Sequence, residues 1–160
     1  MLPLIITPNE ILRAVAKPAI LPPTEEEIKL AQGLIEAMKH YHGIGLAAPQ
    51  VNVSTRLIVV ATAGEPTVYF NPEISKNSWR KIEMEEGCLS IPGVFGLVKR
   101  PARVLAKYFN LSGQEKEEWL DGMVARIYQH EVDHLNGILF TDKATKLISG
   151  QELLAQYGLG

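Results

Sequence analysis

The chain has 160 residues, of which 46% are hydrophobic, and its formal net charge is -2. This length suits one globular domain, so we expect a single domain over residues 1–160. The near-neutral charge argues against DNA binding, or non-specific nucleic-acid binding, as the main activity. No apolar run approaches the ~18 residues of a transmembrane helix, and the N-terminal sequence lacks the features of a signal peptide. We therefore expect a cytoplasmic protein without membrane contact, and the single cysteine excludes an internal disulfide.

The first predicted helix follows a proline-rich N-terminal segment. Thr24 and Glu27 form a capping-box pattern, and apolar residues continue from there at helical spacing. We expect this helix to end near His42, because Gly43 is a typical C-terminal cap. A glycine-rich turn comes next.

The middle of the chain predicts a series of short strands, and the last two of them form a hairpin. These strands cover residues 56–61, 68–70, 81–85, 103–109 and 114–119. Asp121 begins a second helix that ends near Gly137, and a short third helix is predicted over residues 145–157. Because the strands cluster without β-α-β alternation, we expect an α+β fold. Mostly antiparallel strands would pack around the second helix, with an N-terminal helix and a short C-terminal helix beside them.

The second predicted helix carries the sequence HEVDH at residues 130–134, an H-E-x-x-H motif. Histidines at positions i and i+4 lie one helical turn apart, so both can hold one metal ion. Glu131 flanks that face, where a general base for metal-bound water belongs. Because Met123 and Ile127 share the histidine face, we expect this face to point inward.

Two histidines leave a catalytic metal one protein ligand short. The downstream histidine of many zinc peptidases is missing, because Phe140 occupies that position. Glu152 is the one downstream glutamate, but it belongs to the short last helix. A lone cysteine can serve packing or nucleophilic catalysis, yet Cys88 follows a strand in a loop bounded by Gly87 and Pro92. A thiolate beside a divalent cation loses its proton readily, so Cys88 is the better candidate.

Three segments together resemble one family, the peptide deformylases. Residues 43–50 read GIGLAAPQ and are similar to the family's first motif, GxGxAAxQ. Residues 86–90 (EGCLS) and 129–137 (QHEVDHLNG) match its second and third motifs, in the family's order and at its usual spacing. The resemblance implies a metal-dependent hydrolase that removes the formyl group from formyl-methionine of newly made polypeptides.

The resemblance also implies a role for each motif residue. It makes Cys88, His130 and His134 the ligands of one divalent metal, with Fe2+ preferred and Ni2+, Co2+ or Zn2+ as substitutes. It makes Glu131 the catalytic acid and base, and it assigns Gln50 and the backbone N–H of Leu89 to the developing oxyanion. Two other functions stay open: a small H-E-x-x-H metallopeptidase, and a non-catalytic structural zinc protein, which would usually need four protein ligands.

The pocket for the methionine side chain has five candidate residues. They are Ile44, Gly45, Met84, Met123 and Ile127. Gly45 lacks a Cβ and so permits close approach of an extended peptide, while Met123 and Ile127 share the histidine face. For the apolar candidates, plain core packing is the alternative interpretation.

Two positions depart from the best-known bacterial members of the family. His42 lies where an acidic residue is common, and Phe95 lies where a basic residue is common. The preference for residues after methionine is therefore left open by the resemblance.

Charged residues near the motifs can orient the metal ligands. A ligand histidine usually donates its second N–H to a carboxylate, and Glu86 and Asp133 are candidates for that acceptor. Arg100 or Arg126 could pair with either carboxylate. For partners, we expect a nascent formyl-methionyl peptide, a monomeric enzyme and a transient ribosome contact, although few positive charges lie near the C-terminus.

Overall fold

The computed structural model describes residues 1–160, which form two α-helices, eight β-strands and four short 3-10 turns. Helix α1 covers Glu25–His40 and helix α2 covers Gly122–Leu135. The strands are β1 (Gly45–Ala47), β2 (Leu57–Val60), β3 (Thr67–Asn77), β4 (Lys81–Cys88), β5 (Ile91–Pro101), β6 (Val104–Phe109), β7 (Glu115–Leu120) and β8 (Ala144–Ser149). The 3-10 turns are η1 (Glu10–Leu12), η2 (Ala48–Val51), η3 (Phe140–Asp142) and η4 (Gln151–Leu153). Neither helix combines the length and the apolar character that a membrane span requires.

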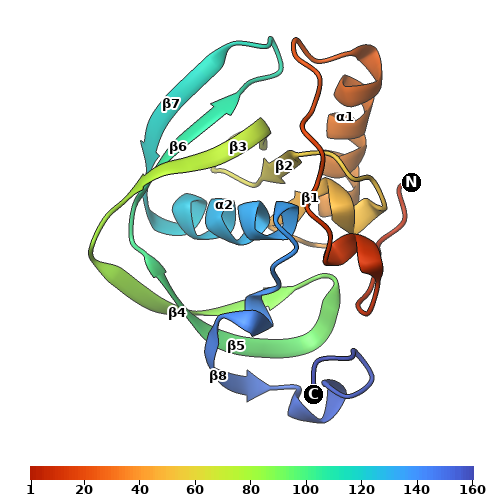
Figure 1. Cartoon of the computed structure of the whole chain (residues 1–160), viewed down its shortest axis with the longest axis vertical. Coiled ribbons are helices and arrows are strands. Elements are labelled where there is room, and N and C mark those ends of the chain that lie inside the picture. The colour runs from red at the N-terminus through yellow and green to blue at the C-terminus, as the bar shows by residue number, and fades with distance from the viewer.

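The strands form two sheets on either side of α2. A five-stranded sheet has the order β1-β2-β3-β6-β7, and a three-stranded sheet has the order β4-β5-β8. Every pairing in the two sheets is antiparallel. Figure 1 shows α2 running between the sheets and α1 lying beside β1 and β2. The predicted α+β fold with a central helix is therefore confirmed.

The five-stranded sheet has one helix on each face, and the alternation of side chains in β2 explains this arrangement. Leu57 and Val59 pack in one buried cluster with Leu34 of α1. Their neighbours Ile58 and Val60 point to the opposite face and pack in the cluster that contains α2. Because all four side chains of β2 are buried, the strand reads as a continuous apolar run.

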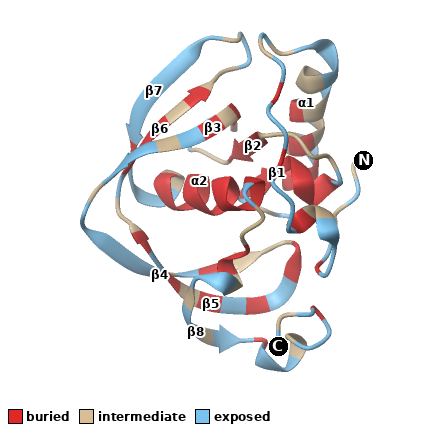
Figure 2. Cartoon of the chain, in the orientation of Figure 1, coloured by how far each residue is buried: buried red, intermediate tan, exposed pale blue.

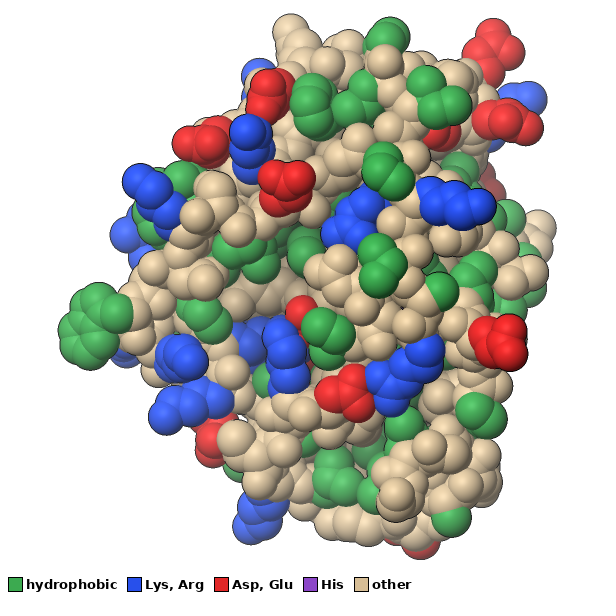
Figure 3. All heavy atoms as spheres, in the orientation of Figure 1, with side chains coloured by type: hydrophobic (Ala, Val, Ile, Leu, Met, Phe, Trp, Pro, Cys, Tyr) green, Lys and Arg blue, Asp and Glu red, His purple; other side chains and the backbone are tan.

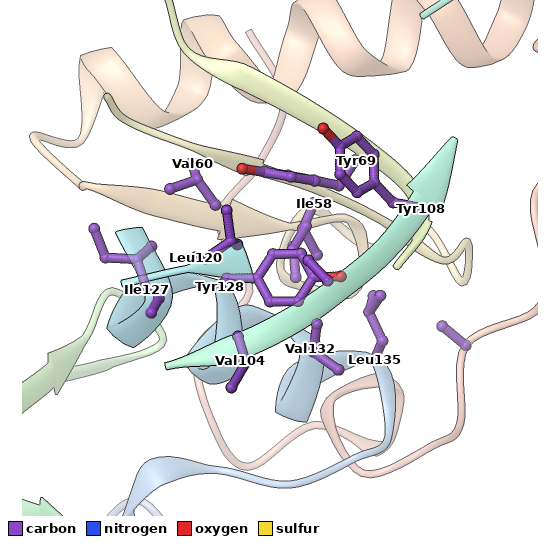
Figure 4. Close-up of a cluster of buried hydrophobic side chains, with 14 residues drawn as sticks. Ile58, Val60, Tyr69, Val104, Tyr108, Leu120, Ile127, Tyr128, Val132 and Leu135 are labelled. Carbon is purple, nitrogen blue, oxygen red and sulfur yellow. The ribbon is translucent and has the colours of Figure 1, made fainter. Parts of the chain in front are cut away.

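Helix α2 is buried along most of its length, as Figure 2 shows. Its last eleven residues, from Ala125 to Leu135, are all buried. In the cluster drawn in Figure 4, Tyr128 of α2 contacts Tyr69 edge to face, with ring centroids 5.0 Å apart. The Tyr128 hydroxyl donates a hydrogen bond of 2.7 Å to the Glu73 carbonyl, so this buried phenol is paired. These contacts hold α2 against the five-stranded sheet.

The N-terminal helix has the predicted capping box. The Thr24 hydroxyl accepts the Glu27 N–H at 3.3 Å, and the Glu27 carboxylate accepts the Thr24 N–H at 3.3 Å. The helix ends at His40, slightly before the expected position. The Gly43 N–H then donates to the Met38 carbonyl at 2.8 Å, and the chain turns into β1.

The predicted helix over residues 145–157 is wrong. Strand β8 occupies its first five residues, because β5 would otherwise have an unpaired edge, and only the turn η4 follows. Gly150 turns the chain with a φ of 86°, at a point where a Cβ would lie 2.3 Å from the Gly93 carbonyl oxygen. The tail then packs back on the protein, and the Tyr157 hydroxyl donates to the Pro92 carbonyl at 2.7 Å.

Several strands are longer than the sequence predicts. Strand β3 continues through Asn71 to Asn77, because Asn71 forms an irregularity with a φ of 48° instead of ending the strand. Its side chain accepts the Ala19 N–H at 2.7 Å and donates to the Ala19 carbonyl at 3.2 Å. Strands β1 and β5 contain glycines at Gly45 and Gly96 and were not expected as strands.

Candidate metal centre and active site

The turn after β4 brings Cys88 to the histidine face of α2. Cys88 is the last residue of β4, and β5 begins three residues later. The Cys88 Sγ lies 3.3 Å from the His134 Nε2, and the rings of His130 and His134 have centroids 5.1 Å apart. One ligand atom from each of these three residues lies within 4.8 Å of the others. The structure therefore brings together the three side chains that the sequence predicts as metal ligands.

The chemistry of these donors fits a divalent transition metal. One thiolate and two imidazoles suit Fe2+, Ni2+, Co2+ or Zn2+, whereas Mg2+ and Ca2+ prefer oxygen ligands. Burial lowers the pKa of His134 well below its usual value, so this imidazole is neutral and able to bind a cation. Burial also acts to lower the pKa of His130, but hydrogen bonds with Cys88 and Glu86 outweigh it and raise that pKa. The centre thus attracts positive charge.

Glu86 orients His130 from the side opposite the metal position. The Nδ1 of His130 lies 2.8 Å from the Glu86 carboxylate. This contact directs the Nδ1–H to the carboxylate and leaves Nε2 for a metal. Burial alone would raise the pKa of Glu86, but hydrogen bonds from His130 and Arg100 outweigh burial and hold it far below its usual value. Glu86 therefore stays ionised at the bottom of the site.

Both candidate arginines pair with Glu86. Arg100 contacts the carboxylate through Nε at 2.6 Å and Nη2 at 2.9 Å, and Arg126 contacts it through Nη1 at 2.7 Å. Arg100 also reaches Asp133 at 2.8 Å, and Lys143 reaches the same carboxylate at 3.0 Å. The question that the sequence left open is therefore resolved: both arginines hold Glu86, and only Arg100 continues to Asp133.

Glu131 lies beside the metal ligands and is almost completely buried. Its Oε1 has no hydrogen-bond partner within the protein. The pKa of Glu131 is raised to about 7, and burial is the largest cause. The charge of His130 acts to lower this pKa, and the charge of Glu86 acts to raise it. A carboxyl group with this pKa can accept and return a proton near neutral pH. Gly45 leaves room for it, because a Cβ there would lie 2.7 Å from the Glu131 Oε2 and 2.5 Å from the Ile127 Cγ2.

Two further hydrogen-bond donors face the same region. The side-chain Nε2 of Gln50 lies 3.1 Å from the Ser90 hydroxyl and 3.6 Å from the Cys88 Sγ. The Gln50 Oε1 accepts the Ala47 N–H at 3.0 Å, which fixes the amide with its NH2 group toward Cys88. The backbone N–H of Leu89 donates to no other main-chain group. Gln50 and Leu89 are therefore placed beside the metal ligands, as the sequence analysis expects.

A cavity of about 570 Å3 opens above these residues. Of the predicted pocket residues, four line the cavity: Ile44, Gly45, Met123 and Ile127. Met84 does not line it, although the four residues that follow it in β4, from Glu85 to Cys88, do. We correct this assignment: Met84 pairs with Val98 inside the three-stranded sheet, one strand position too far from the turn.

The cavity wall also contains residues outside the three sequence motifs. Leu4 and Tyr41 line it together with Gly93, and both departing residues, His42 and Phe95, lie on it as well. Leu4 comes from a segment without secondary structure. The Ile5 N–H donates to the Gln50 carbonyl at 2.7 Å, and the Thr7 N–H donates to the Ser90 carbonyl at 3.0 Å. No motif marks this N-terminal segment, so only the tertiary structure reveals its position.

The comparisons with known proteins agree with this site. The family model described as polypeptide deformylase matches residues 1–149. The peptide deformylase of Halothermothrix orenii is 44% identical over 148 residues, which cover 91% of this chain and 94% of that protein. The crystal structure of the peptide deformylase from Thermotoga maritima has a TM-score of 0.87 at 41% identity, covering 91% of this chain and 98% of that chain.

A third similarity includes a bound peptide. The structure of the peptide deformylase from Acinetobacter baumannii with Met-Ala-Ser bound has a TM-score of 0.86 at 38% identity. It covers 89% of this chain and 98% of that chain. With a family model that covers nearly the whole length and relatives above 40% identity, the chain belongs to the polypeptide deformylase family.

Proposed function

We propose that this peptide deformylase hydrolyses the N-terminal formyl group of formyl-methionyl polypeptides, giving formate and a free amino terminus. One observation carries the proposal: the buried Glu131, with an unpaired carboxylate oxygen, lies beside the cluster of Cys88, His130 and His134 at the base of a cavity. A metallopeptidase or a structural zinc site explains fewer of these features. The family and the Met-Ala-Ser complex of the Acinetobacter relative support the same choice.

Cys88, His130 and His134 would hold the metal, and we propose Fe2+ as the resident ion. A bound divalent metal supplies a Lewis acid that lowers the pKa of water and polarises the formyl oxygen. The three protein donors leave a position open, as catalytic sites require and structural four-ligand sites do not. Glu86 would keep His130 in the tautomer that binds the ion.

Glu131 would move the proton in both halves of the reaction. It takes a proton from the water as the water oxygen bonds to the formyl carbon. It then gives that proton to the amide nitrogen as the carbon–nitrogen bond breaks, so formate and the free amine leave. A pKa of about 7 suits both transfers, because the carboxyl group can accept and donate near neutral pH.

Gln50 and Leu89 would stabilise the negative charge that develops on the formyl oxygen. The Gln50 amide is held on both sides, by Ala47 at its oxygen and by Ser90 at its nitrogen, so its N–H is fixed in advance. The Leu89 N–H is free of main-chain partners beside it. Each such donor, aimed at an oxyanion in a dry site, contributes about 10²–10³-fold in rate.

The peptide would bind along the free edge of β1. This strand pairs with β2 on one side and has no strand on the other, so an extended peptide can add to it. Ile44 and Gly45 place this edge on the cavity, and Met123 and Ile127 offer apolar contacts for the methionine side chain. A cytoplasmic location, a monomeric state and transient ribosome contact stay predictions.

The test is a formate-release assay with formyl-Met-Ala-Ser under anaerobic conditions, using enzyme loaded with Fe2+. We expect Glu131→Gln to keep its metal and to lose turnover, because the amide cannot accept the proton. The matched control is Glu152→Gln, which removes an exposed carboxylate that does not line the cavity and should leave turnover unchanged. Equal turnover in Glu131→Gln and the native enzyme would refute the assignment of Glu131.

A second variant separates the alternative functions. Cys88→Ala should lose bound metal together with deformylation, because it removes the thiolate ligand. Retained metal combined with cleavage of internal peptide bonds would instead indicate a metallopeptidase. Metal binding without any hydrolysis of formyl-Met-Ala-Ser by the native chain would indicate a structural site.

A further inference from the structure

Both tryptophans of the chain are exposed at one end of the five-stranded sheet. Trp79 lies in the turn between β3 and β4 and is 94% exposed, and Trp119 of β7 is 45% exposed. The guanidinium of Arg103 lies over the Trp119 ring, 5.0 Å from its centroid. Exposed apolar side chains are informative where they gather, and here both tryptophans are exposed in one region.

Hydrogen bonds to the turn between β5 and β6 hold the turn that carries Trp79. The Ser78 N–H donates to the Arg103 carbonyl at 2.9 Å, and the Ala102 N–H donates to the Arg80 carbonyl at 2.9 Å. The Arg103 N–H also donates to the Ser78 hydroxyl at 3.0 Å. The backbone on both sides of Trp79 is therefore fixed, while its indole ring stays in solvent. A rigid support lowers the entropy cost of using that ring to bind a ligand.

Positive charge accompanies the two aromatic rings. Lys76, Arg80, Lys81 and Arg103 are all exposed within or beside these two turns. Figure 3 shows Lys and Arg side chains next to a protruding hydrophobic side chain at the left edge, where Figure 1 places the turn between β3 and β4. The chain as a whole has a formal net charge of -2, so the positive charge here is a local feature.

A second hollow lies between these residues. It has a volume of about 460 Å3 and is lined by Ser78, Arg80, Ile82, Ala102, Arg103, Asp121 and Gly122. Two guanidinium groups on its wall can bind phosphate oxygens, and Asp121 is the single carboxylate among the lining residues. We call Trp79, Arg80, Lys81, Arg103 and Trp119 the tryptophan surface.

We propose that the tryptophan surface binds single-stranded or looped RNA. Bases would stack on Trp79, and Arg80 and Arg103 would pair with phosphates around the hollow. Exposed aromatic rings beside Lys and Arg are the combination that binds unpaired nucleotides, whereas protein interfaces are depleted in lysine. The positive charge complements phosphates and would repel a basic partner.

The tryptophan surface lies next to the catalytic cavity. Asp121 and Gly122 line the hollow, and the next residue, Met123, lines the catalytic cavity. RNA bound here would therefore lie next to the catalytic cavity. The link between RNA binding and deformylation rests on the proposed function, but RNA binding can be measured independently of catalysis.

The test measures fluorescence anisotropy of a labelled 12-nucleotide single-stranded RNA titrated with the full-length, metal-loaded enzyme. We expect Trp79→Ala to weaken binding by about tenfold and Trp79→Phe to restore most of it, because phenylalanine also stacks. Arg80→Gln should weaken binding and reduce its salt dependence, because the logarithmic slope falls by about 0.7 for each phosphate that the protein no longer neutralises. Lys29→Gln, an exposed charge removed from α1, is the matched control and should bind like the native chain.

Several results would overturn the proposal. Absence of RNA binding at low salt would do so, and so would equal binding by Trp79→Ala and Lys29→Gln. Equal affinity for the matching single-stranded DNA would reject the assignment to RNA. A native dimer that Trp79→Ala converts to monomers, without RNA binding, would make the surface a protein interface. Formyl-Met-Ala-Ser turnover should be unchanged in every variant, so a failure here is distinct from a failure of the proposed activity.

Discussion

Adding one methyl group at Gly45 should reduce catalysis without removing the metal. A Cβ at this position would lie 2.5 Å from the Ile127 Cγ2 and 2.7 Å from the Glu131 Oε2. Ordinary contacts between such atoms are about 3.5 Å or longer, so the side chains of α2 must shift by roughly 1 Å. A misplacement of this size at a reacting group costs about 10²-fold in rate, and overpacking costs about 1–3 kcal/mol of stability.

The assay compares kcat with formyl-Met-Ala-Ser, bound metal and the melting temperature for Gly45→Ala and the native enzyme. Gly64→Ala is the control, because a Cβ there meets no atom within 4 Å and should change none of the three. Native kcat in Gly45→Ala would refute the claim that Gly45 makes room for the catalytic carboxylate.

Four further predictions concern three residues around the site. Glu86→Gln should lower metal affinity by about 10–100-fold, measured by competition with a chelator, because the acceptor that orients His130 is weakened. The folded-state pKa of Glu86 is depressed, so the stabilisation that its carboxylate provides is complete above about pH 4.3, the unfolded-state pKa, and is lost as the pH falls below that value. Urea titrations at several pH values should show this loss in the free energy of unfolding, and a smaller loss in Glu86→Gln. Gln50→Leu should lower kcat by about 10²–10³-fold at native metal content, and an unchanged kcat would contradict the oxyanion role. Tyr157→Phe should raise KM more than it lowers kcat, because removal of its hydrogen bond releases Pro92 on the cavity wall; stopped formate assays measure both constants.

The central helix and its chemistry could be predicted from the sequence because the information is local. The spacing of His130 and His134 fixes their shared face, whatever the rest of the chain does. The capping box at Thr24 is equally local and is confirmed. Cys88 lies 42 residues before His130 by sequence number, so spacing could not place it beside the helix. The missing third ligand and the loop around Cys88 made it a candidate, and the family resemblance implied its role as a ligand.

The errors concern features that depend on distant partners. Residues 144–149 become a strand because β5 offers an edge, and nothing within those residues states that requirement. Met84 was assigned to the pocket by its type, but its distance from the cavity depends on how β4 and β5 pair. The contacts of Ile5 and Thr7 with the two oxyanion segments carry no motif at all. The network around Glu86 likewise needed coordinates, because either arginine could have satisfied the carboxylate.

The metal ligands come from two different layers of the molecule, and this has a consequence for assembly. Cys88 and Glu86 belong to the three-stranded sheet, whereas His130 and Arg126 belong to the helix that packs on the five-stranded sheet. A bound ion would therefore be a cross-link between layers, and the carboxylate of Glu86 bridges the same boundary without it. The complete set of three ligands exists only after the two layers have docked. Removing the ion should accordingly loosen the smaller sheet first, and amide hydrogen exchange would detect that order as faster exchange in β4 and β5.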